Sequence, residues 1–209
     1  LLAEFTKLRQ SDKLILDMCT GNAPVPLVLS LKTDAKIIGF ELQRAIAELA
    51  WESISINGLD KQIKVINDDV KNIGEFFKPN TFDVITCNPP YFKINDDKNK
   101  NKNDYLTLAR HEIAIDLETI FKLVNRFLKD NGVFYMVHRA ERLDEIIILA
   151  NKYKLNVKEI QFISTKKNNN PSTILVKCVK NSKIGVKIKR EICVDNLSTY
   201  QHLFEGSGK

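Results

Sequence analysis

Short apolar segments alternate with amphipathic segments along most of this chain, and the alternation limits the folds that it can adopt. Apolar runs typical of buried strands occur at residues 13–19, 36–41, 63–68, 81–88 and 133–138. Segments with the apolar spacing of helices occur at residues 24–32, 43–58, 116–132 and 142–154. An order of strand, helix, strand favours a mostly parallel sheet with helices on both faces.

The last two apolar runs follow a different pattern. Residues 156–164 and 172–180 are joined by a short polar loop without a helix, which favours an antiparallel edge. We therefore predict an α/β, Rossmann-like fold with a mostly parallel seven-stranded sheet, in a single domain over residues 1–209. The polar segment 93–104 has almost no apolar residues and is predicted to be a flexible insertion.

Polar residues stand where each of the first four predicted strands ends. The first strand ends in Asp17 and leads into a turn with Gly21, the second ends in Glu41, and the third is followed by Asp69. The fourth leads into Asn-Pro-Pro-Tyr at residues 88–91. In an open parallel sheet, ligands bind beyond the carboxyl ends of the strands. These residues are therefore predicted to share one site.

The glycine turn and the acids favour one kind of ligand. The turn lacks the three glycines of a dinucleotide fingerprint, which counts against NAD. Glu41 can accept hydrogen bonds from ribose hydroxyls, and acidic residues suit a ligand with cationic groups. S-adenosylmethionine, a nucleoside with an amino acid and a sulfonium, would suit Asp17, Glu41 and Asp69 together. The alternative is that Asp17 and Asp69 only cap helices.

The order of these motifs resembles the class I methyltransferases that act on exocyclic or amide nitrogens. The segments LDMCTGNAPVPLVLS, TCNPPYF, ARHEI, VHRAERLDEII and IQFIS together resemble the bacterial tRNA1(Val) (adenine-N6)-methyltransferases, in their Gram-positive or mycoplasma-like branch. That family methylates the adenosine at tRNA position 37, beside the anticodon. Its members usually carry a longer N-terminal segment, of which only LLAEFTKLR is expected to remain here. The first motif departs from the usual form, because Cys19 and Ala23 stand where glycines are common.

The resemblance implies roles for three groups of residues. The catalytic group is Asn88, Pro89, Pro90 and Tyr91. The residues implied to bind the cofactor are Asp17, Cys19, Gly21, Asn22, Glu41, Leu42, Asp69, Val70 and Asn88. The residues implied to contact the RNA are Phe92, Lys93, Arg110, His111, His138, Arg139 and Arg142. No metal is implied.

The Asn-Pro-Pro-Tyr motif suits methyl transfer to an adenine amine. The N6 lone pair is delocalised into the ring, so the amine must be held by acceptors that strengthen as it gains positive charge. The Asn88 side-chain carbonyl and the Pro89 backbone carbonyl are the predicted acceptors, and Tyr91 is predicted to stack on the flipped base. The alternative is an inert turn, because two prolines also rigidify ordinary loops.

The formal net charge of +6 permits a nucleic-acid partner but also fits a general bias toward lysine. Basic residues concentrate at Lys177, Lys180, Lys183, Lys187, Lys189 and Arg190, which we predict to contact tRNA phosphates. The alternative is a solvated basic surface. Trp51 is predicted to lie in the core. No apolar run is long enough to span a membrane, and the scattered cysteines suggest no zinc site. We predict a cytoplasmic protein. We also predict that it is a monomer.

Three other functions remain open at this stage. Asn-Pro-Pro-Tyr also serves enzymes that methylate the N5 of glutamine, which usually add an N-terminal helical domain, and DNA adenine-N6-methyltransferases, which usually add a target-recognition domain. A non-catalytic RNA-binding module on the same fold is the third. The acids at the strand ends favour an enzyme over such a module.

Overall fold

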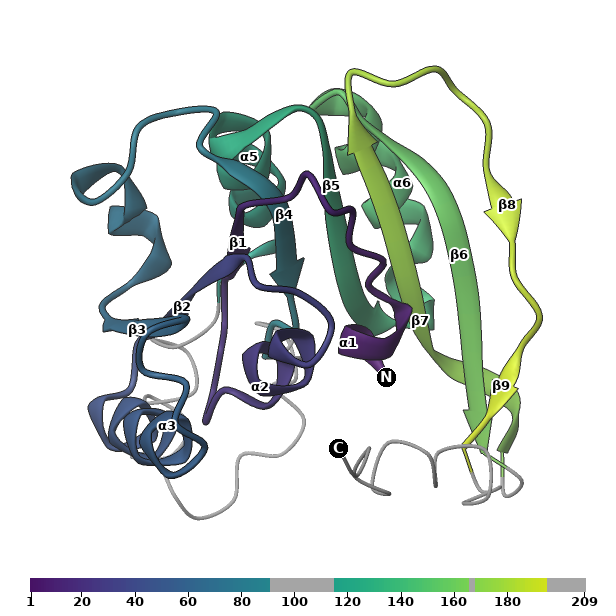
Figure 1. Ribbon diagram of the computed structural model, residues 1–209. Coiled ribbons are helices and arrows are strands. Elements are labelled where there is room, and N and C mark those ends of the chain that lie inside the picture. Colours follow the sequence, from purple (N-terminus) through teal and green to yellow (C-terminus); the bar gives the residue numbers. More distant parts are fainter. Residues whose placement is uncertain (91–114, 166–167, 195–209) are drawn as a thin grey trace, which may run out of the picture.

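The computed structural model describes residues 1–90, 115–165 and 168–194, which form one mixed sheet with helices on both faces (Figure 1). The strand order is β3-β2-β1-β4-β5-β7-β6-β8, and β9 pairs with β6. The strands are β1 (Leu14–Asp17), β2 (Lys36–Glu41), β3 (Ile63–Asn67), β4 (Phe82–Cys87), β5 (Leu128–Arg139), β6 (Leu155–Thr165), β7 (Asn168–Lys180), β8 (Lys187–Ile188) and β9 (Ile192–Cys193).

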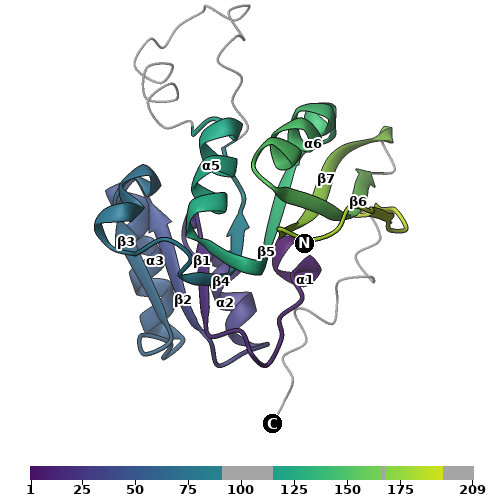
Figure 2. The ribbon, with the colours of Figure 1, turned by 90° about the horizontal axis from the view of Figure 1, so that it is seen from above.

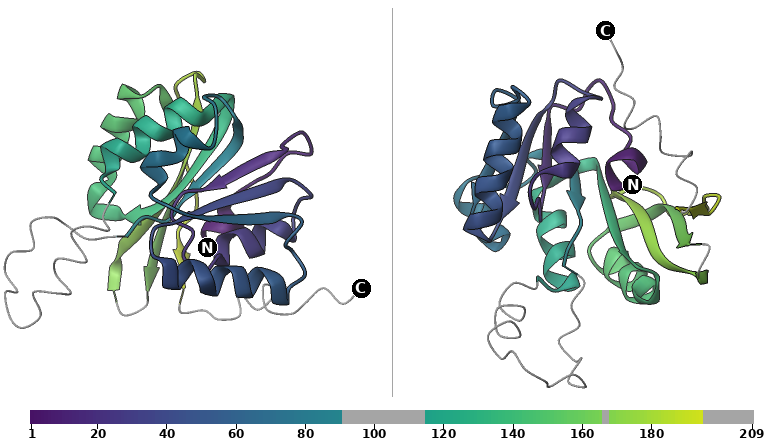
Figure 3. Two further views of the ribbon diagram at one scale, coloured as in Figure 1. Left: turned by 90° about the vertical axis from the view of Figure 1, so that its left-hand side faces the viewer. Right: turned by 90° about the horizontal axis from the view of Figure 1, so that it is seen from below.

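Two helical layers cover the sheet, as Figures 2 and 3 show. The α-helices are α1 (Leu2–Phe5), α2 (Pro24–Ser30), α3 (Arg44–Ile56), α5 (Leu117–Phe127) and α6 (Leu143–Lys152), and the 3-10 helices are η1 (Val70–Glu75) and η3 (Ala140–Arg142). Apolar side chains of α5, α6 and η1 pack in one core, and those of α1, α2 and α3 pack in a second core. Each helix therefore buries its apolar stripe against one face of the sheet.

The predicted fold class is confirmed. Strands β3, β2, β1, β4 and β5 are parallel, and β7 runs antiparallel to both β5 and β6. The two-residue strands β8 and β9 pair with β6 and come in addition to the seven predicted strands. No helix in the described ranges is long and apolar enough to cross a membrane.

One predicted boundary is wrong. The sequence pattern extends a helix over residues 116–132, but α5 ends at Phe127 and Leu128 already has extended backbone angles, with φ −74° and ψ 136°. Leu128 pairs with Phe82 of β4, so cross-strand pairing takes over where helical spacing continues. The apolar period alone could not locate this change.

Trp51 is not a core residue. Its side chain on α3 is 41% exposed, and its indole Nε1 donates to the Val65 backbone carbonyl at 3.1 Å. Val65 belongs to β3, the edge strand of the parallel half, so Trp51 covers part of an open sheet edge.

Lys180, which was predicted to contact tRNA phosphates, is buried at the end of β7. Its Nζ donates to Asn80 Oδ1 at 2.8 Å, to the Asn125 carbonyl at 2.6 Å and to the Leu128 carbonyl at 2.8 Å. The Asn125 carbonyl lies in the last turn of α5, where a cation is favourable. Lys180 therefore ties the antiparallel edge to the junction of α5 and β5.

Candidate functional site

A cavity of about 520 Å³ lies where the first four strands end, a size typical of small-molecule sites. Its lining comes from the end of β2 and from the segments that follow β1, β2, β3 and β4, with additions from α2 and from Ile115. The lining residues are Met18, Cys19, Thr20, Gly21, Asn22, Pro24, Val25, Phe40, Glu41, Leu42, Gln43, Asp68, Asp69, Val70, Lys71, Asn88, Pro89, Pro90 and Ile115. The four strand ends identified in the sequence therefore meet in one place.

The turn after β1 spans residues 20–23 and is called the glycine turn below. Gly21 has φ 57° and Ala23 has φ 67°, so two of its residues adopt left-handed conformations. The Ala23 amide donates to the Thr20 carbonyl at 3.0 Å, and α2 begins at once with Pro24, a proline position that helices favour. The turn is therefore tight enough to bring backbone groups to the cavity wall.

Glu41 reaches from the end of β2 to the glycine turn. Its Oε2 accepts from the Gly21 amide at 3.0 Å, and its Oε1 accepts from the Gln43 amide at 2.9 Å. Each carboxylate oxygen has a second lone pair, so Glu41 can still accept from ligand hydroxyls. The carboxylate thus links the turn to β2 and faces the cavity at the same time.

Asp68 and Asp69 line the cavity after β3 and also shape the chain there. Asp69 Oδ1 accepts from the Lys71 amide at 2.9 Å, which caps η1, and Asp68 Oδ1 accepts from Asn72 Nδ2 at 2.9 Å. Lys71 Nζ lies 3.5 Å from Asp69 Oδ2. Capping and ligand contact, treated as alternatives in the sequence, are therefore compatible for Asp69.

Asp17 does not line the cavity. It is 1% exposed behind the wall, and its carboxylate accepts from Thr20 Oγ1 at 2.8 Å and from Thr86 Oγ1 at 2.7 Å. Burial raises the pKa of Asp17 to about 6, although both hydroxyls act in the opposite direction. Asp17 therefore lies beneath the cavity wall, and its predicted role in cofactor binding stays a prediction.

The segment Asn88-Pro89-Pro90, called the proline corner below, lines the cavity directly after β4. The Asn88 side chain is exposed, Pro89 is buried and Pro90 is partly buried. The corner is thus open to the cavity at its asparagine and held by packing at its first proline. Tyr91, the last residue of the predicted motif, lies outside the described residues.

The residues predicted to contact RNA fall into two sets. Phe92, Lys93, Arg110 and His111 lie outside the described residues, as does the predicted insertion at 93–104. Of the other three, His138 and Arg139 are the last two residues of β5 and Arg142 ends η3, and none of them lines the cavity.

His138 is not a surface cation. It is 4% exposed, its Nδ1 accepts from the Arg139 amide at 2.9 Å, and burial lowers its pKa to about 4, so it is neutral at physiological pH. Arg142 binds Glu145 through two bonds of 2.7 Å, and Arg139 Nε lies 3.3 Å from Glu141. The two arginines are therefore partly neutralised by neighbouring acids.

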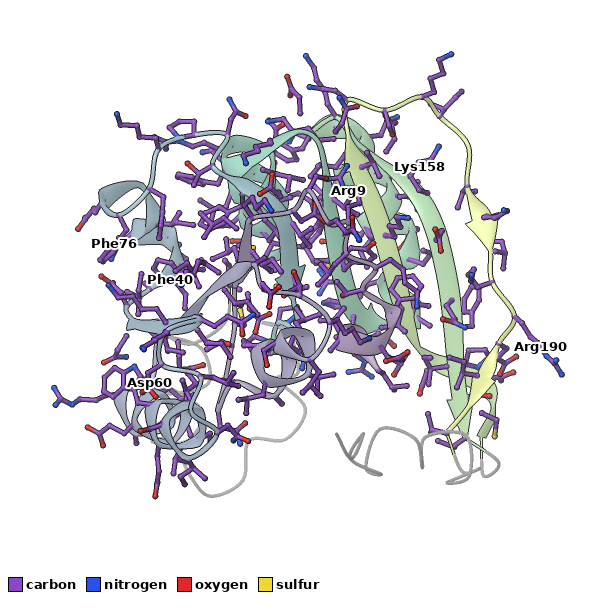
Figure 4. All side chains as sticks on the ribbon, in the orientation of Figure 1. Arg9, Phe40, Asp60, Phe76, Lys158 and Arg190 are labelled. Carbon is purple, nitrogen blue, oxygen red and sulfur yellow. The ribbon has the colours of Figure 1, made fainter. Side chains whose placement is uncertain are left out.

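Several lining residues escaped the sequence analysis. Thr20, Gln43 and Lys71 are sequence neighbours of predicted residues, so extending each strand end by one or two positions would have found them. Phe40 differs, because it lies on β2 and reaches the cavity while its ring packs on Phe76 at 5.7 Å, edge to face (Figure 4). Strand alternation carries no signal of that contact.

Comparisons with known proteins agree with this geometry. The family model described as methyltransferase domain matches residues 9–192. A tRNA1(Val) (adenine(37)-N6)-methyltransferase of Bacteroides thetaiotaomicron is 30% identical over 176 residues, which cover 83% of this chain and 71% of the relative. A protein of the same name from Phocaeicola vulgatus is 27% identical over 162 residues, with 78% and 67% covered.

Solved structures share the fold. A protein of Agrobacterium tumefaciens named a predicted O-methyltransferase superposes with a TM-score of 0.70 at 16% identity, covering 92% of this chain and 85% of that one. A geranyl diphosphate methyltransferase in complex with S-adenosylmethionine gives a TM-score of 0.61 at 11% identity, covering 87% and 83%.

Proposed function

We propose that this chain methylates the N6 of an adenosine in tRNA with S-adenosylmethionine. The chain belongs to the methyltransferase domain family, and its relatives include proteins named tRNA1(Val) (adenine(37)-N6)-methyltransferase. One observation carries the proposal: the glycine turn, Glu41, Asp69 and the proline corner line a single cavity. A cofactor site and an amine-binding corner side by side are what direct methyl transfer requires.

The charges around the cavity fit a cationic cofactor. Its lining contains three carboxylates, Glu41, Asp68 and Asp69, and one basic side chain, Lys71. Behind the wall, Asp17 is buried, and no basic side chain in the described part of the chain pairs with it. Uncompensated buried charge is costly, so a positively charged ligand in front of it would be stabilised. S-adenosylmethionine supplies an activated methyl group when it is bound.

The proposed roles of the lining residues follow their positions. Glu41 accepts from the ribose hydroxyls, and the residues after β3, Asp69 and Val70, hold the adenine of the cofactor. The Asn88 side-chain carbonyl and the Pro89 backbone carbonyl accept hydrogen bonds from the N6 amine of the substrate. The amine gains positive charge in the transition state, so these bonds strengthen during the reaction. The chain supplies orientation and needs no nucleophilic side chain.

The finer features of the substrate belong to the proposal as well. The names of the relatives support adenosine 37 of tRNA1(Val), next to the anticodon, where an unpaired base is cheaper to flip out than a paired one. A monomer in the cytoplasm that acts without a metal ion remains our prediction. The proposed RNA roles of Tyr91, Phe92, Lys93, Arg110 and His111 remain predictions too, as does the Gram-positive or mycoplasma-like branch.

The decisive experiment combines the purified protein, unmodified tRNA and S-adenosylmethionine with a labelled methyl group. Nucleosides are then analysed by mass spectrometry. We expect the label in N6-methyladenosine, and fragments of tRNA1(Val) should place it at position 37. Label in glutamine N5 of a release factor, or in DNA but not in tRNA, would replace this function by one of its alternatives. If the protein binds tRNA but calorimetric titration with S-adenosylmethionine gives no heat of binding, a non-catalytic RNA-binding module would be supported.

A further inference from the structure

A buried chain of hydrogen bonds joins the two halves of the site. Thr20 directly precedes Gly21 in the glycine turn, and Thr86 lies two residues before Asn88 in the proline corner. The carboxylate of Asp17 lies between the two hydroxyls, with Thr20 Oγ1 on Oδ2 at 2.8 Å and Thr86 Oγ1 on Oδ1 at 2.7 Å. All three bridging residues are at most 2% exposed. Neither threonine is among the site residues predicted from the sequence.

The sheet register builds this bridge. Asp17, the last residue of β1, pairs with Thr86 on β4 and with Gly39 on β2. A Cβ atom on Gly39 would lie 2.8 Å from Thr20 Oγ1 and 2.9 Å from its Cβ and Cγ2, closer than such atoms approach in proteins. The Thr20 amide also donates to the Phe40 carbonyl at 2.9 Å. Gly39 therefore leaves the space in which Thr20 can turn toward Asp17.

We propose that Thr20 and Thr86 are positioning residues that, through Asp17, hold the glycine turn and the proline corner in a fixed relation to each other. The inference rests on the proposed function, in which the turn helps to hold the cofactor and the corner holds the adenine amine. Methyl transfer needs donor and acceptor in line, and small misalignments reduce the rate strongly. Hydrogen bonds from hydroxyls to a carboxylate are short and strong, so they suit this purpose.

The bridge also predicts a pH signature. The hydroxyls of Thr86 and Thr20 lower the pKa of Asp17, while burial and the nearby Glu41 raise it. Cys87, which follows Thr86 on β4, also interacts electrostatically with Asp17. A cationic cofactor binds better when Asp17 is ionised. Cofactor affinity should therefore fall as the pH drops through about 6, the pKa of Asp17.

The test compares Thr86→Val, which removes the hydroxyl with little change of shape, with Thr86→Ser, which keeps it. Thr81→Val is the matched control, because Thr81 stands before β4 at the opposite end and its hydroxyl donates to the Lys78 carbonyl. We expect kcat to fall about 10- to 100-fold in Thr86→Val. Thr86→Ser should restore most of the activity, and Thr81→Val should behave like the wild type.

Calorimetry with S-adenosylmethionine between pH 5 and 8 gives a readout that is independent of turnover. In Thr86→Val the loss of affinity should begin at a higher pH than in the wild type, because the lost donor had stabilised the carboxylate. Thermal unfolding shows whether the variant is folded; if it is not, the pair Thr20→Val and Thr20→Ser makes the same test from the glycine turn.

Two outcomes separate this inference from the proposed function. An active wild type together with a folded Thr86→Val that keeps normal kcat and an unshifted pH step would overturn the positioning role alone. A wild type that neither binds the cofactor nor methylates tRNA would overturn the proposed function, and the positioning role with it.

Discussion

Two buried charged side chains, Asp17 and Lys180, show how differently the two halves of the sheet use charge. Lys180, on the antiparallel edge, donates to three oxygens, two of which are backbone carbonyls. Asp17, in the parallel half, accepts from two hydroxyls and has no cationic partner among the described residues. The first arrangement is complete in itself and holds the fold. The second lies behind a cavity wall, in front of which the proposed cationic cofactor would offset its charge.

The largest expected effect lies on the cavity side of this comparison. Asn88→Ala should reduce methylation at least about 100-fold, because it removes the proposed acceptor for the charge that develops on the amine. Cofactor affinity should stay within a few-fold of the wild type, and the melting temperature should stay the same, because Asn88 is exposed. Single-turnover assays with labelled cofactor and calorimetry give these quantities. Normal turnover would remove Asn88 from the mechanism.

The second effect concerns the structural charge. Lys180→Met should lower the free energy of unfolding by roughly 2–4 kcal/mol, because it leaves the buried Leu128 carbonyl and the half-buried Asn125 carbonyl without their donor. The end of α5 and the start of β5 should loosen first, since Asn125 and Leu128 supply two of the acceptors. Urea denaturation measures the loss, and hydrogen exchange locates it. At low temperature the folded variant should keep its kcat, and a selective loss of kcat would contradict a purely structural role.

The third effect has the opposite sign and concerns Asp17. The pKa of Asp17 is raised from 3.8 to about 6 in the folded protein, so the folded state binds more protons than the unfolded state between these values. Ionisation of Asp17 therefore costs stability as the pH rises from about 4 to about 6. Asp17→Asn keeps hydrogen-bonding capacity toward both threonines without the charge. We expect the ligand-free variant to be more stable than the wild type at pH 7, on the order of 1 kcal/mol.

The stability of Asp17→Asn must be compared with that of the wild type at each pH, because His138 also contributes to the pH dependence. Its pKa is lowered to about 4, so its contribution to stability rises with pH and partly offsets that of Asp17 in the wild type. Subtracting the denaturation curves of wild type and Asp17→Asn at each pH cancels the His138 contribution. A difference that does not change between pH 4 and pH 7 would show that the Asp17 carboxylate pays no burial cost.

The sequence predicted the parallel half better than the antiparallel edge, for physical reasons. Strand and helix periods are local, and parallel strands bring their carboxyl ends to one edge, so Gly21, Glu41, Asp69 and Asn88 could be placed together without coordinates. The junction at Leu128 could not be located, because its pairing with Phe82 is a contact between distant residues.

The errors in individual roles also come from contacts between distant residues. Whether a lysine near the chain's basic region is exposed or buried depends on its three-dimensional neighbours, and Lys180 reaches acceptors 52 to 100 positions away. The bridge through Asp17 was hidden as well, because Thr86 is separated from it by 69 positions and is brought beside it only by the β1–β4 register. A threonine in a sequence does not by itself indicate such a role.

The smallest expected effect tests what remains of the basic surface once Lys180 is assigned to the fold. Lys187 is exposed on β8, the outer edge of the sheet, along which Lys158 and Arg190 also lie (Figure 4). If this edge contacts tRNA phosphates, Lys187→Ala should weaken tRNA binding only a few-fold and reduce the salt dependence of binding by about one counterion. Its stability should match the wild type, which also makes it the control for Lys180→Met. Fluorescence anisotropy at several salt concentrations measures how the affinity for tRNA depends on salt. An unchanged salt dependence would place the phosphate contacts on another surface. The structural role of the buried Lys180 would not be affected.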